Sequence, residues 1–171
     1  MTLQQLRYVT AIAETGTLSA AARRFYIAQP SLTASLRELE EELGLTIFRR
    51  TNRGAVLTLQ GDFKKVQSLA SGHVLCGAGA SLATVCSFAR GQGLTGLEFA
   101  WGIPGQLGGA VYMNAGAYGG EMKQVVERVH FLEADGTPGV MSGEDLAFGY
   151  RKSAFMGTKR IITSAELRLE N

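Results

Sequence analysis

The stretch from Gly102 to Gly120 limits the possible folds of this chain more than any other. It reads GIPGQLGGAVYMNAGAYGG, with seven glycines, one proline and no charged residue. Because each interior glycine costs a helix roughly 1 kcal/mol relative to alanine, the composition predicts that this stretch is not helical. Large apolar residues such as Tyr112 and Met113 indicate packed structure rather than a disordered linker.

Composition alone leaves two interpretations of these glycines open. Glycines among residues of the buried type usually mark backbone that adopts positive φ or that another group approaches closely. In the first interpretation, a loop turns its bare N–H groups toward an anionic cofactor such as a dinucleotide pyrophosphate. In the second, the glycines form tight β-turns in an all-β core.

Charge and glycine content divide the chain near Gly61. The first 61 residues contain seven arginines, no lysine and five acids, whereas the remainder is electrically neutral. Only four of the 22 glycines lie in that first part. The shift predicts two domains, residues 1–61 and 75–171, with a junction at 62–74 in which residues 62–71 could supply only a short helix.

The first part has the pattern of three helices. Apolar residues recur at helical spacing from residue 2 to about 14, and Gly16 ends that run. A short alanine-rich helix is expected at 19–25, and a third helix starts at Gln29 and ends at Gly44. One stripe of the third helix is predicted to be buried, namely Leu32, Leu36, Leu39 and Leu43.

Two strands, 46–50 and 55–59, follow around Asn52-Arg53-Gly54 and complete a mainly α winged helix-turn-helix. In that fold the third helix lies in the DNA major groove with its first residues toward the base edges, while basic residues reach phosphates. The predicted DNA-binding residues are Gln29, Pro30, Ser31, Thr33, Ser35 and Arg37 in the helix, and Arg50 and Arg53 in the wing. The alternative is a three-helix core with an arginine-rich solvated face.

These residues resemble the N-terminal domain of LysR-type transcriptional regulators. The matching motifs are Leu-Arg-Tyr-Val at 6–9, the alanine-rich 18–24, Ala-Gln-Pro-Ser-Leu-Thr at 28–33, Leu-Glu-x-Glu-Leu-Gly at 39–44 and Phe-x-Arg at 48–50. The resemblance covers residues 1 to about 60. It implies sequence-specific DNA binding, with a homodimer as a possible assembly.

The second part begins with a strand at 73–76, a glycine turn at 77–81 and a helix at 82–90. Strand, glycine turn and helix suggest a Rossmann dinucleotide site, and Glu98 lies at a suitable distance for its acidic residue. Leu82, however, occupies the position of the third glycine, so this interpretation is weak. A hairpin turn at Asp135-Gly136, a capped turn at 142–146 and a closing strand at 161–169 are also expected.

Residues 75–169 resemble the middle of the UDP-N-acetylenolpyruvoylglucosamine reductase family, also called UDP-N-acetylmuramate dehydrogenases. The motifs are Gly-Ala-Gly-x-Ser-Leu at 77–82, Gly-Leu-x-Gly-Leu-Glu-Phe at 93–99, Ile-Pro-Gly-x-x-Gly-Gly-Ala at 103–110, Met-Asn-Ala-Gly-Ala-Tyr-Gly at 113–119 and Phe-Gly-Tyr-Arg-x-Ser-x-Phe at 148–155. The resemblance implies a partial α+β FAD-binding domain. The implied cofactor-binding residues are Gly102, Ile103, Pro104, Gly105, Gly108, Gly109, Ala110, Asn114, Gly116 and Tyr118.

In this family NADPH reduces the flavin, which then passes hydride to the enolpyruvyl double bond of a UDP-sugar during peptidoglycan precursor synthesis. The resemblance makes Arg151 the catalytic cation beside the substrate carboxylate, with Tyr150 next to it in the substrate site. The family's proton-donor serine and C-terminal glutamate have no counterparts before Asn171, and Ser153 is not that serine. Its first FAD subdomain is also absent, so the reductase is expected to be incomplete and inactive.

Other features of the sequence limit the possible functions. Cys76 and Cys86 match neither a zinc motif nor a redox Cys-x-x-Cys, so both are predicted to be reduced core residues, and no metal site is expected. No apolar run reaches the ~18 residues of a membrane helix and no signal peptide is evident, which predicts a cytoplasmic protein. Three functions remain open: a flavoenzyme fragment, a DNA-binding regulator with a flavin-related domain, or a non-functional chimera.

Overall fold

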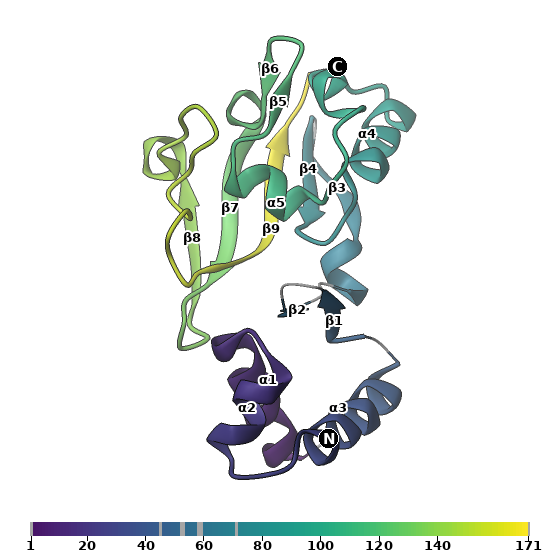
Figure 1. The fold of residues 1–171 in the computed structure, drawn as a ribbon. Coiled ribbons are helices and arrows are strands. Elements are labelled where there is room, and N and C mark those ends of the chain that lie inside the picture. The colour runs from purple at the N-terminus through teal and green to yellow at the C-terminus, as the bar shows by residue number, and fades with distance from the viewer. Residues whose placement is uncertain (1, 45, 52–53, 58–59, 71, 171) are drawn as a thin grey trace. The chain divides into compact units, whose positions relative to one another are not determined.

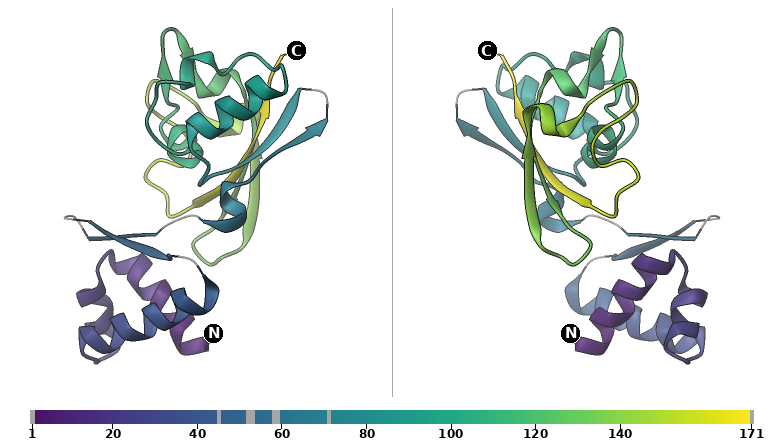
Figure 2. Two further views of the ribbon diagram at one scale, coloured as in Figure 1. Left: turned by 90° about the vertical axis from the view of Figure 1, so that its right-hand side faces the viewer. Right: turned by 90° about the vertical axis from the view of Figure 1, so that its left-hand side faces the viewer.

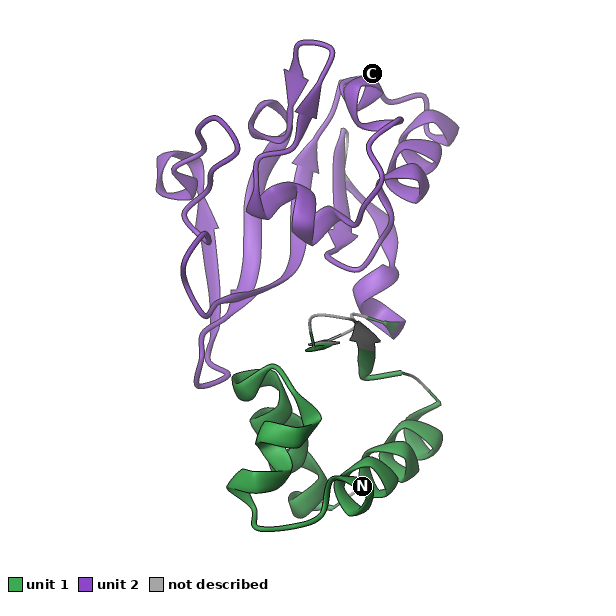
Figure 3. Ribbon diagram, in the orientation of Figure 1, with its two compact units in different colours: residues 1–60 green, residues 61–171 purple. Residues whose placement is uncertain are grey.

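The computed structural model describes residues 2–44, 46–51, 54–57, 60–70 and 72–170 (Figure 1). They form two compact units, residues 1–60 and 61–171 (Figure 3). The α-helices are α1 (Leu3–Thr15), α2 (Leu18–Arg24), α3 (Gln29–Leu43), α4 (Leu82–Gly91) and α5 (Leu107–Tyr112). The strands are β1 (Phe48–Thr51), β2 (Gly54–Leu57), β3 (Val66–Ala70), β4 (His73–Gly77), β5 (Gly116–Ala117), β6 (Gly120–Glu121), β7 (Val126–Leu132), β8 (Pro138–Ser142) and β9 (Ile161–Arg168).

The helices of the first unit begin and end within about one residue of the positions that the sequence indicated. At the start of α1, Thr2 and Gln5 form a capping box in which each side chain accepts the other's backbone N–H. α1 ends at Gly16 and α3 at Gly44, with φ of +72° and +65°, the left-handed conformation that glycine adopts without strain. The three predicted helices are therefore confirmed.

The core of the first unit is centred on Ile12, Leu32 and Leu39, which are almost fully buried. The predicted buried stripe of α3 is wrong at its last position, because Leu43 is 44% exposed. This leucine lies in the final turn of α3, next to the terminating Gly44, where the buried face of the helix has already ended.

The predicted hairpin is confirmed as the antiparallel pair β1–β2, in which Arg49 faces Val56. Glu40 ties this wing to α3, because its Oε1 accepts the backbone N–H groups of Ile47 (2.7 Å) and Phe48 (3.1 Å). Ala55 N–H donates to the carbonyl of Gly16 at 2.7 Å, which fixes the second strand against the end of α1. The wing is thus an integral part of this unit.

The second unit is built on a five-stranded sheet of order β3-β4-β9-β7-β8. Every neighbouring pair is antiparallel. The predicted closing strand, β9, lies in the centre of this sheet between β4 and β7. The Rossmann interpretation is wrong, because that fold requires parallel strands joined by helical crossovers.

One face of this sheet is apolar and the other is polar. Cys76, Ala165 and Val129 lie side by side on β4, β9 and β7 and are buried. α4 and α5 cover the apolar face (Figure 2). Burial, and to a smaller extent Cys86, raises the pKa of Cys76 to about 12. Both cysteines are buried and free, which confirms their predicted place in the core.

Residues 62–74, expected to be a junction, contribute to the sheet itself. A 3-10 turn (Gly61–Lys64) precedes β3, which pairs with β4 from Val66 to Ala70. The possible helix at 62–71 is therefore a single turn followed by an edge strand. Val66 and Leu69 are three residues apart rather than two, and the pairing shifts register between Ser68 and Ala70, so the sequence lacks the alternation that would have indicated a strand.

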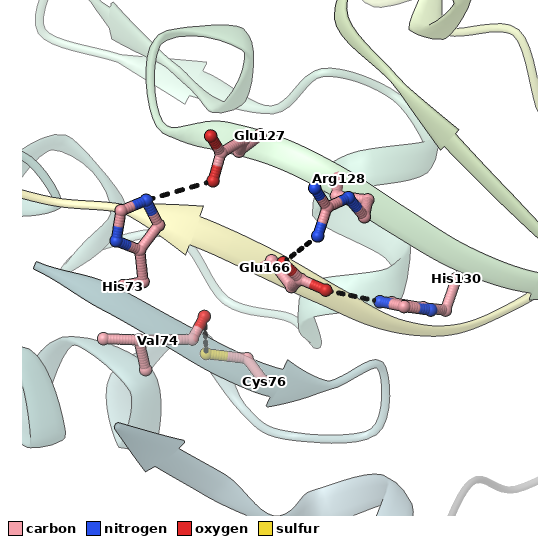
Figure 4. Close-up of polar contacts among 7 residues, drawn as sticks. All are labelled: His73, Val74, Cys76, Glu127, Arg128, His130 and Glu166. Carbon is pink, nitrogen blue, oxygen red and sulfur yellow. Dashed lines mark hydrogen bonds and ion pairs between the residues drawn. The ribbon is translucent and has the colours of Figure 1, made fainter. Parts of the chain in front are cut away.

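A charged network crosses the polar face of the sheet (Figure 4). Glu166 on β9 receives hydrogen bonds of 2.8 Å from Arg128 and from the ring Nε2 of His130, both on β7. Burial disfavours the charged form of Glu166, but the hydrogen bonds from His130 and Arg128 outweigh it and keep the pKa of this carboxyl below its usual value. Glu166 therefore remains ionised and links the central strand β9 to its neighbour β7.

We expect this network to make the stability of the second unit depend on pH. A carboxyl whose pKa is lowered by folding stabilises above the unfolded value, about 4.3, and loses that contribution as pH falls through the folded value. Glu166→Gln should cost about 1 kcal/mol at pH 7 and progressively less toward pH 3. Urea unfolding followed by the fluorescence of the single tryptophan, Trp101, measures this; Glu144→Gln on an exposed turn is the control. An equal cost of Glu166→Gln at both pH values would contradict the assignment.

Candidate functional site

The glycine-rich stretch is divided among a loop, a helix and a hairpin. Residues 101–106 form the loop, α5 follows, and β5 and β6 form the hairpin. The prediction that the stretch contains no helix is wrong, because Gly108 and Gly109 lie inside α5. Burial of Leu107, Ala110 and Val111 in the core outweighs the low helix propensity of the two glycines.

Gly108 allows the two glycine motifs to meet. A Cβ at this position would lie 2.9 Å from the Cβ of Ala78, closer than packed side chains approach. The N–H of Gly108 donates to the carbonyl of Ala78 at 2.8 Å, and that of Leu107 to Ala80 at 2.9 Å. Backbone hydrogen bonds thus hold the start of α5 directly against the Gly77–Ser81 turn.

The loop before α5 presents backbone donors that the protein leaves unused. Among the residues that the structure describes, none accepts a hydrogen bond from the N–H groups of Gly102, Gly105 or Gln106. A Cβ added at Gly102, Gly105 or Gly109 would meet no atom within 4 Å. Bare amides beside open glycine faces are the arrangement that proteins use to bind phosphate groups.

The remaining predicted residues of this loop have different positions. Pro104 is exposed, and Ile103 is half-buried with its N–H bonded to the carbonyl of Ala100. Ala110 is buried in the core, so its side chain supports α5 rather than facing an open site. Gln106, which sequence reasoning missed, contributes an unused donor; no side-chain pattern could have shown this.

Asn114 was predicted to contact the cofactor, but its side chain is only 3% exposed and faces protein. Its Nδ2 donates to Glu121 Oε2 at 2.7 Å and to the carbonyl of Gly149 at 3.0 Å. Its Oδ1 accepts the N–H of Lys123 at 2.8 Å. Both amide donors are therefore occupied, and Asn114 joins three segments of chain.

Gly116 and Tyr118 belong to the β5–β6 hairpin. Tyr118 and Gly119 form its two-residue loop with φ of +53° and +86°, as in a type I′ turn. Tyr118 is 97% exposed at the tip, and Gly116 pairs with Glu121 at the base. A Cβ at Gly116 would overlap the backbone of Gly120, so this glycine serves the hairpin itself.

Arg151 and Tyr150 lie in a tight loop next to this core. The N–H groups of Gly149 and Lys152 donate to each other's carbonyls at 3.0 and 3.1 Å, with Tyr150 and Arg151 between them. The guanidinium carbon of Arg151 lies 5.9 Å from the centre of the Tyr150 ring. Both side chains are exposed, and within the described chain the guanidinium has no carboxylate partner, so it is available to an anion.

Two hydrogen bonds join this loop to the end of α5. Ser153, which is buried, donates from Oγ to the carbonyl of Tyr112 at 2.6 Å. The Asn114–Gly149 bond is the second connection. The two strongest reductase-like motifs, far apart in sequence, are therefore in direct contact.

A pocket of about 610 Å³ lies between the C-terminal end of α4 and residues 93–101. Its lining is mostly apolar and includes Ala89, Leu97 and Trp101. The guanidinium of Arg90 lies 5.8 Å from the Trp101 ring centre. Trp101, which lines this pocket, directly precedes Gly102, whose N–H is the first of the unused donors.

The candidate DNA-binding residues gather at the start of α3. Gln29, Pro30 and Ser31 are exposed, and Thr33 and Ser35 are half-buried. Ser19 Oγ donates to Gln29 Oε1 at 2.7 Å, and no described residue accepts a hydrogen bond from Gln29 Nε2. Arg37 is exposed and pairs with Glu41 at 2.8 Å. Arg50 lies in β1, and Arg53 lies outside the described residues.

Two kinds of site find no support in the described part of the chain. No described helix is both long and apolar enough to cross a membrane. Nor do three or more His, Cys, Asp or Glu side chains come together there in a way that could hold a metal ion.

Comparison with known proteins assigns both units. The family described as "Bacterial regulatory helix-turn-helix protein, lysR family" matches residues 3–62. The family described as "FAD binding domain" matches residues 43–140, so this match begins well before residue 75, where the sequence motifs placed it. The two matches overlap over residues 43–62.

Several curated relatives are UDP-N-acetylenolpyruvoylglucosamine reductases. That of Limosilactobacillus fermentum is 50% identical over 97 residues, covering 57% of this chain and 32% of the relative. That of Limosilactobacillus reuteri is 37% identical over 157 residues, covering 85% of this chain and 53% of the relative. The chain thus spans about a third to a half of these relatives.

The crystal structure of UDP-N-acetylenolpyruvylglucosamine reductase from Thermus caldophilus is also similar. It has a TM-score of 0.59 and 40% sequence identity, over 67% of this chain and 41% of that one. The α+β fold of the second unit agrees with this likeness. The chain therefore belongs to the FAD binding domain family and carries a lysR-family helix-turn-helix at its N-terminal end.

Proposed function

We propose that residues 61–171 bind FAD through the backbone between Gly102 and Gly109. The observation that carries this proposal is the set of unused N–H groups at Gly102, Gly105 and Gln106, which lie beside glycine faces that no side chain fills. A dinucleotide pyrophosphate needs such donors and such close approach. The residues present therefore fit the cofactor that the family implies.

The residues of this unit divide into those that would hold FAD and those that shape its site. The cofactor would contact Gly102, Ile103, Pro104 and Gly105 in the loop and Gly109 on α5. Gly108 keeps α5 against the Gly77–Ser81 turn, and Ala110 supports α5 from the core. Tyr118 reaches outward from the hairpin, and Gly116 shapes that hairpin. When bound, FAD supplies hydride transfer.

We further propose that Arg151 binds the carboxylate of an acidic substrate, with Tyr150 beside it. A fixed guanidinium stabilises negative charge that develops on a carboxylate or enolate without reorganisation, and Arg151 has no competing carboxylate among the described residues. By family, the reductant is NADPH and the acceptor is UDP-N-acetylenolpyruvoylglucosamine, in the cytoplasm. This chain would contribute flavin and substrate contacts to that reaction.

FAD titration tests the proposal directly. Purified protein should bind FAD saturably, with one FAD per chain, measured by flavin fluorescence and by Trp101 emission. NADPH oxidation with and without the UDP-sugar then measures turnover separately. A chain that folds but shows no saturable FAD binding at millimolar FAD would refute the cofactor assignment.

Gly109→Ala should separate binding from stability. The new methyl group enters the open face where the cofactor is proposed to lie, so we expect FAD affinity to fall about tenfold, the effect of a steric cost near 1.4 kcal/mol. Stability should not fall, because alanine is the better helix former by up to about 1 kcal/mol. Gly91→Ala, with equally open surroundings at the end of α4, is the control and should keep wild-type FAD affinity. Unchanged binding by Gly109→Ala would place the cofactor elsewhere.

We propose DNA binding as the function of the first unit. The supporting observation is the exposed start of α3, where the side chains of Gln29 and Ser31, on either side of Pro30, offer hydrogen-bonding groups. Thr33, Ser35, Arg37 and the wing arginines Arg50 and Arg53 complete the proposed contact set. A homodimer would place two such helices on a two-fold DNA site.

Salt dependence is the sharpest test of this second function. Binding of a labelled duplex can be followed by fluorescence anisotropy. The logarithm of the association constant should fall linearly with the logarithm of the salt concentration, with a slope of about −0.9 for each phosphate contacted. Selection from random duplexes would then reveal whether the preferred site is two-fold. Equal anisotropy with and without protein at low salt would exclude DNA binding.

A further inference from the structure

The loop that carries Arg151 is fixed at both ends to a single three-residue stretch. Asn114 donates to the carbonyl of Gly149 at 3.0 Å, and Ser153 donates to the carbonyl of Tyr112 at 2.6 Å. Tyr112 also accepts, through its hydroxyl, the N–H of Gly157 at 3.3 Å. Arg151, midway between the two anchors, has φ of +49°, a conformation that a non-glycine residue keeps only when its surroundings impose it.

Asn114 is the anchor whose side chain makes three hydrogen bonds. It is nearly fully buried, and it has φ of +44°, which asparagine tolerates better than most residues. Its amide and carbonyl groups together contact Gly149, Glu121 and Lys123. Because α5 ends at Tyr112, only that short helix separates Asn114 from the unused amides at 102–106.

We propose that Asn114 is a positioning residue that fixes the Arg151 loop relative to the glycine-rich loop, and so sets where an acidic substrate lies against the cofactor. This inference rests on the proposed function of the two loops. Asn114 itself touches neither ligand, because both donors of its side chain are occupied within the protein. It acts through Gly149 on one side and through α5 on the other.

Glu121 determines which way the Asn114 amide points. A hydrogen bond from Lys123, together with its charge and the hydrogen bond from Asn114, keeps the pKa of Glu121 low. An ionised carboxylate accepts hydrogen bonds only, so it requires the NH₂ side of the amide. The same NH₂ group then has its second hydrogen available for the Gly149 carbonyl. Glu121, Asn114 and Gly149 thus form one directed chain of hydrogen bonds.

Asn114→Asp is the variant that reverses this chain with little change in shape. It places a carboxylate against the Glu121 carboxylate and against the Gly149 carbonyl, while it still accepts from Lys123. The loop should therefore open, and trypsin should cleave after Arg151 and Lys152 about tenfold faster, as mass spectrometry of the released peptides would show. Asn114→Asp with Glu121→Gln removes the repulsion at position 121 but leaves the Gly149 carbonyl without its donor, so it should recover only a small part of the protection.

Ligand binding separates positioning from simple structural support. Calorimetric titration with UDP-N-acetylenolpyruvoylglucosamine should give at least tenfold weaker binding for Asn114→Asp, with little recovery in the double variant, because neither variant has a donor for the Gly149 carbonyl. FAD affinity should stay within about twofold of wild type, because the amides at 102–106 are not altered. Gln67→Glu, the same change of group on exposed β3, should match wild type in every measurement.

The outcomes distinguish this inference from the proposed function. If wild type binds no FAD, the cofactor assignment fails, while substrate binding and cleavage still decide the role of Asn114. Wild-type cleavage or wild-type substrate affinity in Asn114→Asp would overturn the inference, as would equal losses of FAD and substrate affinity. Should Asn114→Asp not fold, Asn114→Gly removes the amide while relieving the positive φ, and the same results are expected.

Discussion

Gly77→Ala is expected to unfold residues 61–171. Gly77 ends β4, and a Cβ there would lie 2.9 Å from the Cα of Phe63 and closer still to the Phe63 carbonyl. The 3-10 turn that carries Phe63 cannot move aside cheaply. The carbonyl of Phe63 accepts the N–H of Gly79 at 2.8 Å, and the carbonyl of Lys65 accepts the N–H of Gly77 at 2.8 Å. The methyl group that Gly77→Ala adds would therefore overlap the Phe63 backbone, which the hydrogen bonds from Gly77 and Gly79 hold in place.

The expected size of this effect follows from the stability of small domains. Overpacking against fixed backbone costs about 3 kcal/mol or more, out of a total of roughly 5–15 kcal/mol. Urea unfolding followed by Trp101 fluorescence should show a much lower midpoint or no folded baseline. Gly91→Ala, whose methyl group meets nothing, should leave the midpoint unchanged or slightly higher. A wild-type midpoint for Gly77→Ala would mean that the turn can shift freely.

The first unit was the more predictable of the two, because local chemistry determines its boundaries. Gly16 and Gly44 end helices through positive φ, and proline in the first turn of α3 marks a beginning, so short sequence windows suffice. Leu43 escaped prediction because burial depends on where the neighbouring elements end. Periodicity identifies a helix face but does not show how far along the helix that face is covered.

The second unit was predictable in its motifs but not in their roles. α5 forms despite Gly108 and Gly109, because tertiary burial decides there, and propensity is only a weak prior. β9 enters the centre of the sheet, a position that its own sequence does not encode. Asn114 lies inside a cofactor-like motif, yet its partners at Gly149 and Glu121 come from other segments. The resemblance assigns Asn114 to a cofactor-binding motif, whereas the folded structure shows that its side chain bonds to other segments of the protein.

Leu32→Ala should unfold the first unit selectively. Leu32 is fully buried on α3 and packs in the core with Ile12 and Leu39. Truncating such a leucine costs about 2–5 kcal/mol. A domain of about 60 residues is marginally stable, so this loss is comparable to the whole free energy of unfolding of the first unit.

The single tryptophan makes the selectivity measurable. Trp101 lies in the second unit, so its urea transition should match wild type in Leu32→Ala, while the helical circular dichroism of the first unit is lost at lower urea. DNA binding should fall with the helical signal, and FAD binding should not. Leu43→Ala makes the same chemical change at a leucine that is 44% exposed, and it should shift the helical transition by less than about 1 kcal/mol. Equal losses in the two leucine variants, or a shared shift of the Trp101 transition, would show that the two cores do not unfold separately.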